Sequence, residues 1–173
     1  MGLYMVGNGA MQTTTGFVKV TTSAAIKTMM QIKPGSTQVV QIVEWGISFD
    51  GSAAATPGEV ELIETDVAAT SLTAYVANDF TKYDNEALLA GDPTTAIFAV
   101  GSSSSGFNTS GGAEGTITAI RNLDAPQLIA PTNQFVKQFP LGREPIIQPG
   151  KFARIRCTFG AAINAYCYML LRA

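Results

Sequence analysis

Apolar and polar residues alternate with a period of two along most of this chain, and no sustained helical period interrupts them. The stretches 26–32 and 58–65 are examples, and Gly, Pro, Asp or Asn separates most such runs. About eight or nine short strands of this kind occur in 173 residues, a length typical of one domain. The pattern predicts an all-β fold, namely an antiparallel β-sandwich that is jelly-roll-like. An immunoglobulin-like sandwich is the alternative.

Some stretches depart from the simple pattern. Residues 66–92 are less regular, with one helical turn expected at 85–89, whereas 95–101 resembles a strand. In the strand that ends at residue 49, alternation places Trp45 on the face opposite Val40 and Ile42.

The motif Ile-x-Pro-Gly occurs at residues 32–35 and again at 147–150. Proline fixes φ at the second position of a type II turn, and glycine takes the positive φ of the third position. Both motifs therefore predict a corner at which the chain enters a new strand.

The first residues differ in composition from the rest. Residues 1–23 carry no charge before Lys19 and are rich in Gly and Thr. They predict an extended N-terminal arm, either lying against a neighbouring molecule or disordered, ahead of a β-sandwich domain at residues 24–173. The arm lacks the pattern of a secretory signal, and no apolar run approaches the roughly 20 residues that cross a membrane.

The low charge of the chain points to contact with other protein. Charged residues make up 14%, against about 25% in ordinary domains. Part of the exterior is therefore expected to meet protein, although Ser, Thr, Asn and Gly could also form a neutral polar surface. The net charge of −2 argues against a nucleic-acid partner.

Histidine is absent, which excludes Ser-His-Asp and Cys-His catalysis and ordinary zinc sites. Glu59 and Glu61 lie two residues apart on one strand, a pattern more typical of a solvated face than of a glycosidase pair. The loop residues Asp79, Asp84, Asn85 and Glu86 could bind calcium but lack the EF-hand spacing. We therefore predict no catalytic residue, cofactor or metal, and a protein that is not an enzyme.

The two cysteines, Cys157 and Cys167, fall on apolar strand positions and are interpreted as small core residues. The strands that carry them are predicted to form a hairpin turning at residues 160–162. Such a hairpin could also bring the two thiols opposite each other, so a disulfide stays open.

The last strand is apolar on both sides. Cys167 and its alternating neighbours form one face, and Tyr166, Tyr168 and Leu170 form the other. A strand of this kind is either enclosed by the fold or covered by a partner, and we expect a subunit contact.

Two adjacent charges, Arg143 and Glu144, lie in a kink between Pro140 and Pro145. The prolines stiffen its ends and Gly142 allows a tight bend, so both charges are expected to point outward. Two interpretations remain, a structural corner in which Arg143 pairs with a local carboxylate, and a contact with a neighbouring subunit.

The segment "QFPLGREPIIQPGKFARIRCTF" at 138–159 and the segment "IVEWGISFDGSAAATPGEVELIET" at 42–65 resemble a group of small β-sandwich proteins of tailed bacteriophages. These are accessory virion proteins similar to capsid decoration, or cement, proteins. The resemblance implies a homotrimer on the capsid exterior, bound to the major capsid protein and assembled in the host cytoplasm. It implies no catalytic residues.

On this basis we expect a protein that decorates and stabilises a phage capsid, with the N-terminal arm docking onto the shell. The expected interface residues are Leu3, Tyr4, Met5, Val6, Phe80, Tyr83, Arg143, Glu144, Tyr166 and Tyr168.

Two alternatives belong to other classes. A receptor- or carbohydrate-binding jelly-roll module of a phage tail would present an aromatic platform from Phe80, Tyr83 and Phe107. A hydrolase would act through Glu59 or Glu61.

Overall fold

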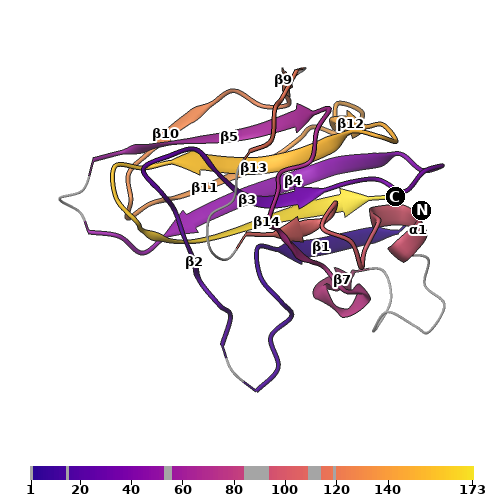
Figure 1. Cartoon of the computed structure of the whole chain (residues 1–173), viewed down its shortest axis with the longest axis horizontal. Coiled ribbons are helices and arrows are strands. Elements are labelled where there is room, and N and C mark those ends of the chain that lie inside the picture. Colours follow the sequence, from indigo (N-terminus) through magenta and orange to yellow (C-terminus); the bar gives the residue numbers. More distant parts are fainter. Residues whose placement is uncertain (1, 15, 53–55, 84–93, 109–113, 119) are drawn as a thin grey trace.

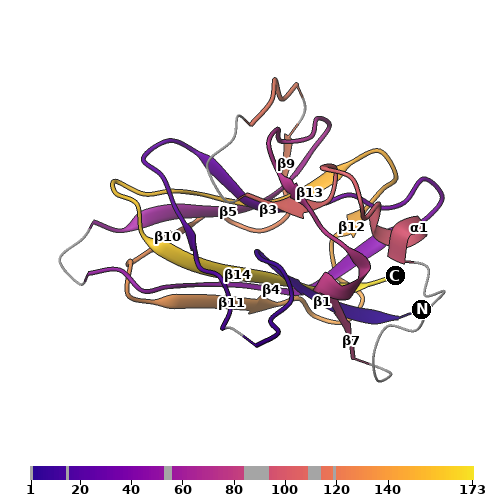
Figure 2. The same cartoon turned by 60° about the horizontal axis from the view of Figure 1, so that its bottom comes forward.

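Two antiparallel sheets pack face to face in the computed structural model, which describes residues 2–14, 16–52, 56–83, 94–108, 114–118 and 120–173 (Figures 1 and 2). The predicted all-β antiparallel sandwich is therefore confirmed. The jelly-roll topology stays a prediction. The predicted turn at 85–89 lies outside the described residues.

The first sheet, sheet A, has strand β14 at its centre. Its path runs through β11 (Gln134–Gln138), β4 (Val40–Phe49), β14 (Asn164–Arg172), β1 (Leu3–Gly7) and β7 (Phe80–Lys82). Two short strands join it at the side, β12 (Ile146–Ile147) on β4 and β2 (Val20–Thr21) on β14.

The second sheet, sheet B, has β13 and β3 in its middle. Its path runs through β10 (Gln127–Ile129), β5 (Gly58–Thr65), β13 (Phe152–Thr158), β3 (Lys27–Ile32), β8 (Gly106–Phe107) and β6 (Thr73–Ala74), with β9 (Ile120–Asn122) on β5. The described helices are short, the 3-10 turn η1 (Ala77–Asp79) and the helix α1 (Thr94–Phe98). Because α1 occupies 94–98, the strand predicted at 95–101 is wrong.

The N-terminal residues do not form an arm at Leu3–Gly7. This segment is strand β1, hydrogen-bonded between β14 and β7, and Tyr4 and Val6 point into the core. The N- and C-terminal ends lie side by side, with the amide of Gly2 donating to the carbonyl of Ala173 at 2.6 Å (Figure 1). The arm prediction is wrong here because the alternation of a short uncharged strand is hard to distinguish from a Gly-rich tail.

The core between the sheets is apolar, with an aromatic cluster at one end. Phe80 stacks on Phe98 with ring centroids 4.6 Å apart, and Tyr4 meets Phe98 edge-on at 5.2 Å. Such ring pairs add to the free energy that burial itself contributes. The buried hydroxyl of Tyr75 donates to the carbonyl of Gly7 at 2.6 Å, so this polar group is satisfied.

A β-bulge changes the facing of β4. The register against β14 shifts so that Leu170 pairs with Glu44 and Leu171 pairs with Ile42, leaving Val43 as the extra residue. Val40, Ile42 and Trp45 consequently all enter the core. The prediction that Val40 and Ile42 oppose Trp45 is wrong because one inserted residue reverses the alternation.

The last two long strands are not a hairpin. β13 lies in sheet B and β14 in sheet A, so the chain crosses the sandwich after residue 158. Cys157 and Cys167 are both buried and both free, as core residues on opposite sheets. The hairpin prediction is wrong, and the disulfide that depended on it does not form.

The two Pro-Gly corners behave differently. Gly150 has φ +82° and the amide of Lys151 donates to the carbonyl of Gln148, as a type II turn requires. Gly35 does not have a positive φ; a Cβ there would collide with the carbonyl of Ala96 in α1. This glycine is needed for close approach of two backbones, so the type II turn predicted at Pro34-Gly35 is wrong. The predicted corner is present, because the chain passes here from β3 to β4.

The outer side of sheet B is covered by loops over a polar layer. Arg154 of β13 is fully buried and donates to the carbonyl of Glu114 at 2.9 Å and to its carboxylate at 3.1 Å. Glu114 also accepts from the amide of Thr28 at 2.7 Å, and Gln31 receives a hydrogen bond from the amide of Ala69. These contacts explain why β3 is buried on both faces.

Removing Glu114 should destabilise the protein strongly. Glu114→Ala leaves the guanidinium of Arg154 buried without its counter-charge, which typically costs about 3–5 kcal/mol. Arg121→Ala, at the more exposed pair with Glu64, is the matched control and should cost less than about 1 kcal/mol. Urea unfolding measures both, and equal losses would contradict the structural role of the buried pair.

The two thiols should be inert in the folded protein. Burial raises the pKa of Cys157 to about 12 and raises the pKa of Cys167 well above its ordinary value, so neither forms a thiolate near pH 8. We expect Ellman's reagent to label both thiols only after unfolding, and reductant to leave the Tm unchanged. Rapid labelling of either thiol in the native state would show that this packing is wrong.

Candidate interaction surface

The side of sheet A that points away from the core carries a strip of apolar side chains, flanked by polar ones such as Gln41, Ser48 and Gln134. Along β14 every second side chain is buried in the core, and the side chains between them are half-buried. The half-buried side chains continue onto the neighbouring strands. Met5 of β1 pairs with Leu170, and Val136 of β11 and Tyr168 both pair with Gly46 of β4, one on each side of it. We call this surface the sheet-A face. Its apolar members are Leu3, Met5, Val136, Ile146, Tyr166, Tyr168 and Leu170.

Two tyrosine rings of this face extend over glycines. A Cβ on Gly7 would lie 2.5 Å from the hydroxyl oxygen of Tyr166, and a Cβ on Gly46 would lie 2.6 Å from Cε1 of Tyr168. The rings therefore occupy the space that side chains at these glycines would take, and they supply the packing that a strand glycine lacks.

The charged groups Glu44 and Arg172 of the sheet-A face have partners within the chain. The hydroxyl of Tyr168 donates to the carboxylate of Glu44 at 2.5 Å, and Arg172 forms an ion pair with Glu144 at 3.4 Å. Burial raises the pKa of Tyr166. Burial and, to a smaller extent, the hydrogen bond to Glu44 raise the pKa of Tyr168. Both hydroxyls are therefore neutral at physiological pH.

The kink at 140–145 lies against the end of this face. Gly142 has φ +81° and the amide of Arg143 donates to the carbonyl of Pro140 at 2.9 Å, which confirms the tight bend. Arg143 is exposed, but Glu144 is buried and accepts from the amide of Gly142 at 2.7 Å. The outward orientation predicted for Glu144 is wrong, because its carboxylate holds the kink and the end of β14 together.

The structure separates the expected interface residues into two sets. Tyr4, Val6 and Phe80 are buried in the core, so their predicted role as contact residues is wrong. Their positions are set by strand alternation in β1 and by the ring stack on Phe98, neither of which a short sequence pattern reveals.

The second set comes together on one surface. Leu3 and Met5 alternate with the buried residues of β1 and join Tyr166 and Tyr168 on the sheet-A face. Tyr83 is 55% exposed, and its hydroxyl donates to the sulfur of Met5 at 3.2 Å. Val136 and Ile146 also belong here. The sequence pattern does not reveal them, because they reach this face only through the pairing of two short strands, β11 and β12, with β4.

The aromatic platform predicted for a sugar does not assemble. Phe80 and Phe107 are buried in the core, which leaves Tyr83 as the exposed member of the three. Of the two carboxylates considered for hydrolysis, Glu59 is exposed and Glu61 forms an ion pair with Arg156 at 2.6 Å.

Of the loop residues considered for calcium, only Asp79 lies within the described residues. Its carboxylate accepts from the amides of Met11 and Val76, each at 2.8 Å, which is a structural role. Asp84, Asn85 and Glu86 lie outside the described residues. Among the described residues no group of three or more acidic or cysteine side chains is placed to hold a metal ion.

Residues 9–19 interrupt a strand that pairs with β14. The amide of Asn8 donates to the carbonyl of Cys167 at 2.9 Å, and Val20 pairs with Ala165, so only Tyr166 of β14 lies between the two contacts. We call residues 9–19 the excursion. It leaves and re-enters the sheet at nearly the same point, as an Ω-loop does, and it protrudes from the sandwich (Figure 1).

The side chain of Asn8 closes the break in the strand. It is fully buried; its Oδ1 accepts from the amide of Cys167 at 3.1 Å and its Nδ2 donates to the carbonyl of Ala165 at 3.3 Å. These are bonds to backbone groups that an interrupted strand would otherwise leave poorly satisfied.

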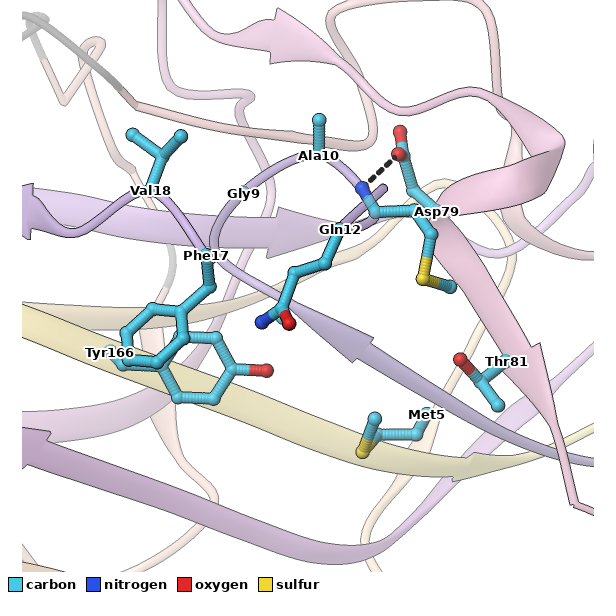
Figure 3. A pocket seen from close by; sticks show the side chains of 11 residues that line it. Met5, Gly9, Ala10, Gln12, Phe17, Val18, Asp79, Thr81 and Tyr166 are labelled. Carbon is cyan, nitrogen blue, oxygen red and sulfur yellow. Dashed lines mark hydrogen bonds between the residues drawn. The ribbon is translucent and has the colours of Figure 1, made fainter. Parts of the chain in front are cut away.

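A hollow of about 220 Å³ lies beneath the excursion (Figure 3). Met5, Thr81 and Tyr166 line it from sheet A, and Gln12 and Phe17 line it from the excursion. The ring of Phe17 rests against Tyr166 with centroids 5.1 Å apart. The excursion thus covers one end of the sheet-A face without filling the space below it.

Comparisons with protein families, curated proteins and solved structures find no match to this chain. In the described part of the chain, no helix has the length and apolar character needed to cross a membrane.

Asn8→Ala should destabilise the fold by about 1–3 kcal/mol, because the buried amide of Cys167 and carbonyl of Ala165 lose a partner. Asn133→Ala, at an exposed asparagine, is the control and should change the free energy of unfolding by less than about 0.5 kcal/mol. If chemical denaturation gave the same stability for both variants, the closing role of Asn8 would be refuted.

Proposed function

We propose that the protein is a non-enzymatic virion component that decorates and stabilises a tailed-phage capsid, as a homotrimer bound to the major capsid protein on the particle's exterior. The single observation that carries this proposal is the sheet-A face, a half-buried apolar surface on an otherwise complete sandwich. Apolar surface of this kind commonly marks a contact with other protein.

The electrostatics of the face favour contact with copies of the same chain. Around a symmetry axis a surface meets itself or a neighbouring patch, so unpaired like charges would repel. Here Glu44 and Arg172 each have a partner within their own chain, and the tyrosine hydroxyls are neutral. The face can therefore be buried between subunits without leaving these charges uncompensated.

The size of the required contact is modest. A stable interface buries about 800 Å² on each partner, and each apolar Å² removed from water contributes about 25 cal/mol. In a trimer, three shell contacts act together, and linked contacts raise the overall affinity well beyond that of one. The resemblance of residues 42–65 and 138–159 to phage accessory proteins supports the same assignment.

A double variant tests the sheet-A face. Met5 and Leu170 are cross-strand neighbours on this face, and Met5→Glu with Leu170→Glu introduces two carboxylates there. We expect the trimer to dissociate to monomers in sedimentation velocity, because burying unpaired charge is costly. Leu128→Glu, at a side chain 82% exposed on sheet B, is the control and should stay trimeric. A wild-type protein that is monomeric at high concentration and ignores capsid shells would overturn the proposal.

A further inference from the structure

The excursion is longer than the fold requires. Asn8 pairs opposite Cys167 and Val20 opposite Ala165, so one residue opposite Tyr166 would complete a continuous strand. Asn8 and Val20 are both buried on the core side, as positions two apart in one strand would be. The remaining residues of the excursion therefore do not serve the pairing of sheet A.

The chemistry of the excursion is that of a contact segment. No charged residue precedes Lys19, and the side chains of Met11, Phe17 and Val18 are 42%, 46% and 60% exposed. Three large apolar side chains on one protruding loop are unfavourable in water unless another surface covers them.

The excursion is held at its base and packed loosely elsewhere. The amide of Met11 is bound to the carboxylate of Asp79, and Lys19 forms an ion pair with Asp50. Phe17 packs one side of its ring on Tyr166, yet a hollow remains beneath the excursion and the side chain of Phe17 stays 46% exposed. This arrangement fixes where the loop leaves the sandwich while leaving its apolar side chains available.

We propose that the excursion is the segment that docks onto the capsid shell, by inserting Met11, Phe17 and Val18 into an uncharged apolar groove of a shell subunit. This inference rests on the proposed function and names the part of the chain that makes the shell contact. The groove must be neutral, because the inserted segment offers no charge to pair with a buried one. The sheet-A face is then left for contacts between copies of this chain.

Two variants test the docking role. Met11→Ser with Phe17→Ser and Val18→Ser removes the apolar side chains, and deletion of residues 10–19 joins Gly9 to Val20 with the register and facing of the strand preserved. Each is mixed with shells assembled from the major capsid protein encoded in the same genome, and bound protein is measured by co-sedimentation. We expect both to lose at least about tenfold in affinity while remaining folded trimers by circular dichroism and sedimentation velocity.

The control removes three apolar side chains elsewhere that are together more exposed than those of the excursion. Val76→Ser with Ile120→Ser and Leu128→Ser replaces side chains 55%, 51% and 82% exposed, and should bind shells as the wild type does. Loss of binding by this control, or undiminished binding by the two excursion variants, would overturn the docking role. Dissociation of the trimer by the deletion would assign the excursion to self-association instead. If the wild-type protein itself fails to bind shells, the proposed function fails rather than this inference alone.

Discussion

The hydrogen-bonded ladders of β14 hold sheet A together. This C-terminal strand pairs with β4 on one side and with β1 and β2 on the other, so the two ends of the chain must meet before the sheet is complete. Every second side chain of β14 is buried in the core, and the side chains between them form the centre of the sheet-A face. The same strand therefore sets the core, the surface and the point at which the excursion leaves the sheet.

The two outer faces of the sandwich are treated differently. The middle of sheet B is covered by its own loops, through the buried Arg154 and the carboxylate of Glu114, whereas Leu128 on β10 stays 82% exposed. Within the described residues, the excursion covers one end of sheet A, where Phe17 rests on Tyr166. The chain itself encloses the middle of sheet B on its outer side. The sheet-A face is therefore the surface for which we expect a partner.

Much of the fold class could be predicted from alternation, because a strand buried on one face needs apolar residues at every second position. Which strands pair could not, since pairing partners lie far apart in sequence. Cys157 and Cys167 look like members of one hairpin yet lie on opposite sheets. A single bulged residue, Val43, reversed the facing expected around it.

The candidate surface was predictable in part for the same reason. Tyr166 and Tyr168 follow directly from the two-sided last strand, whereas Val136 joins them only through the pairing of β11 with β4. The N-terminal segment is uncharged before Lys19 and rich in Gly and Thr, but the prediction that Tyr4 and Val6 form a contact is wrong, because both complete the core. The exposed apolar residues of the N-terminal segment lie further on, at Met11, Phe17 and Val18. No local sequence pattern identifies Asn8 as the residue whose side chain bonds to β14 where the strand is interrupted.

Imaging of the intact particle by cryo-electron microscopy tests the central claim most directly. The account predicts density for this chain on the outer shell in groups of three, with the sheet-A face buried between copies and the excursion inserted into a shell subunit. Particles in which the chain is bound with both the sheet-A face and the excursion open to solvent would contradict it.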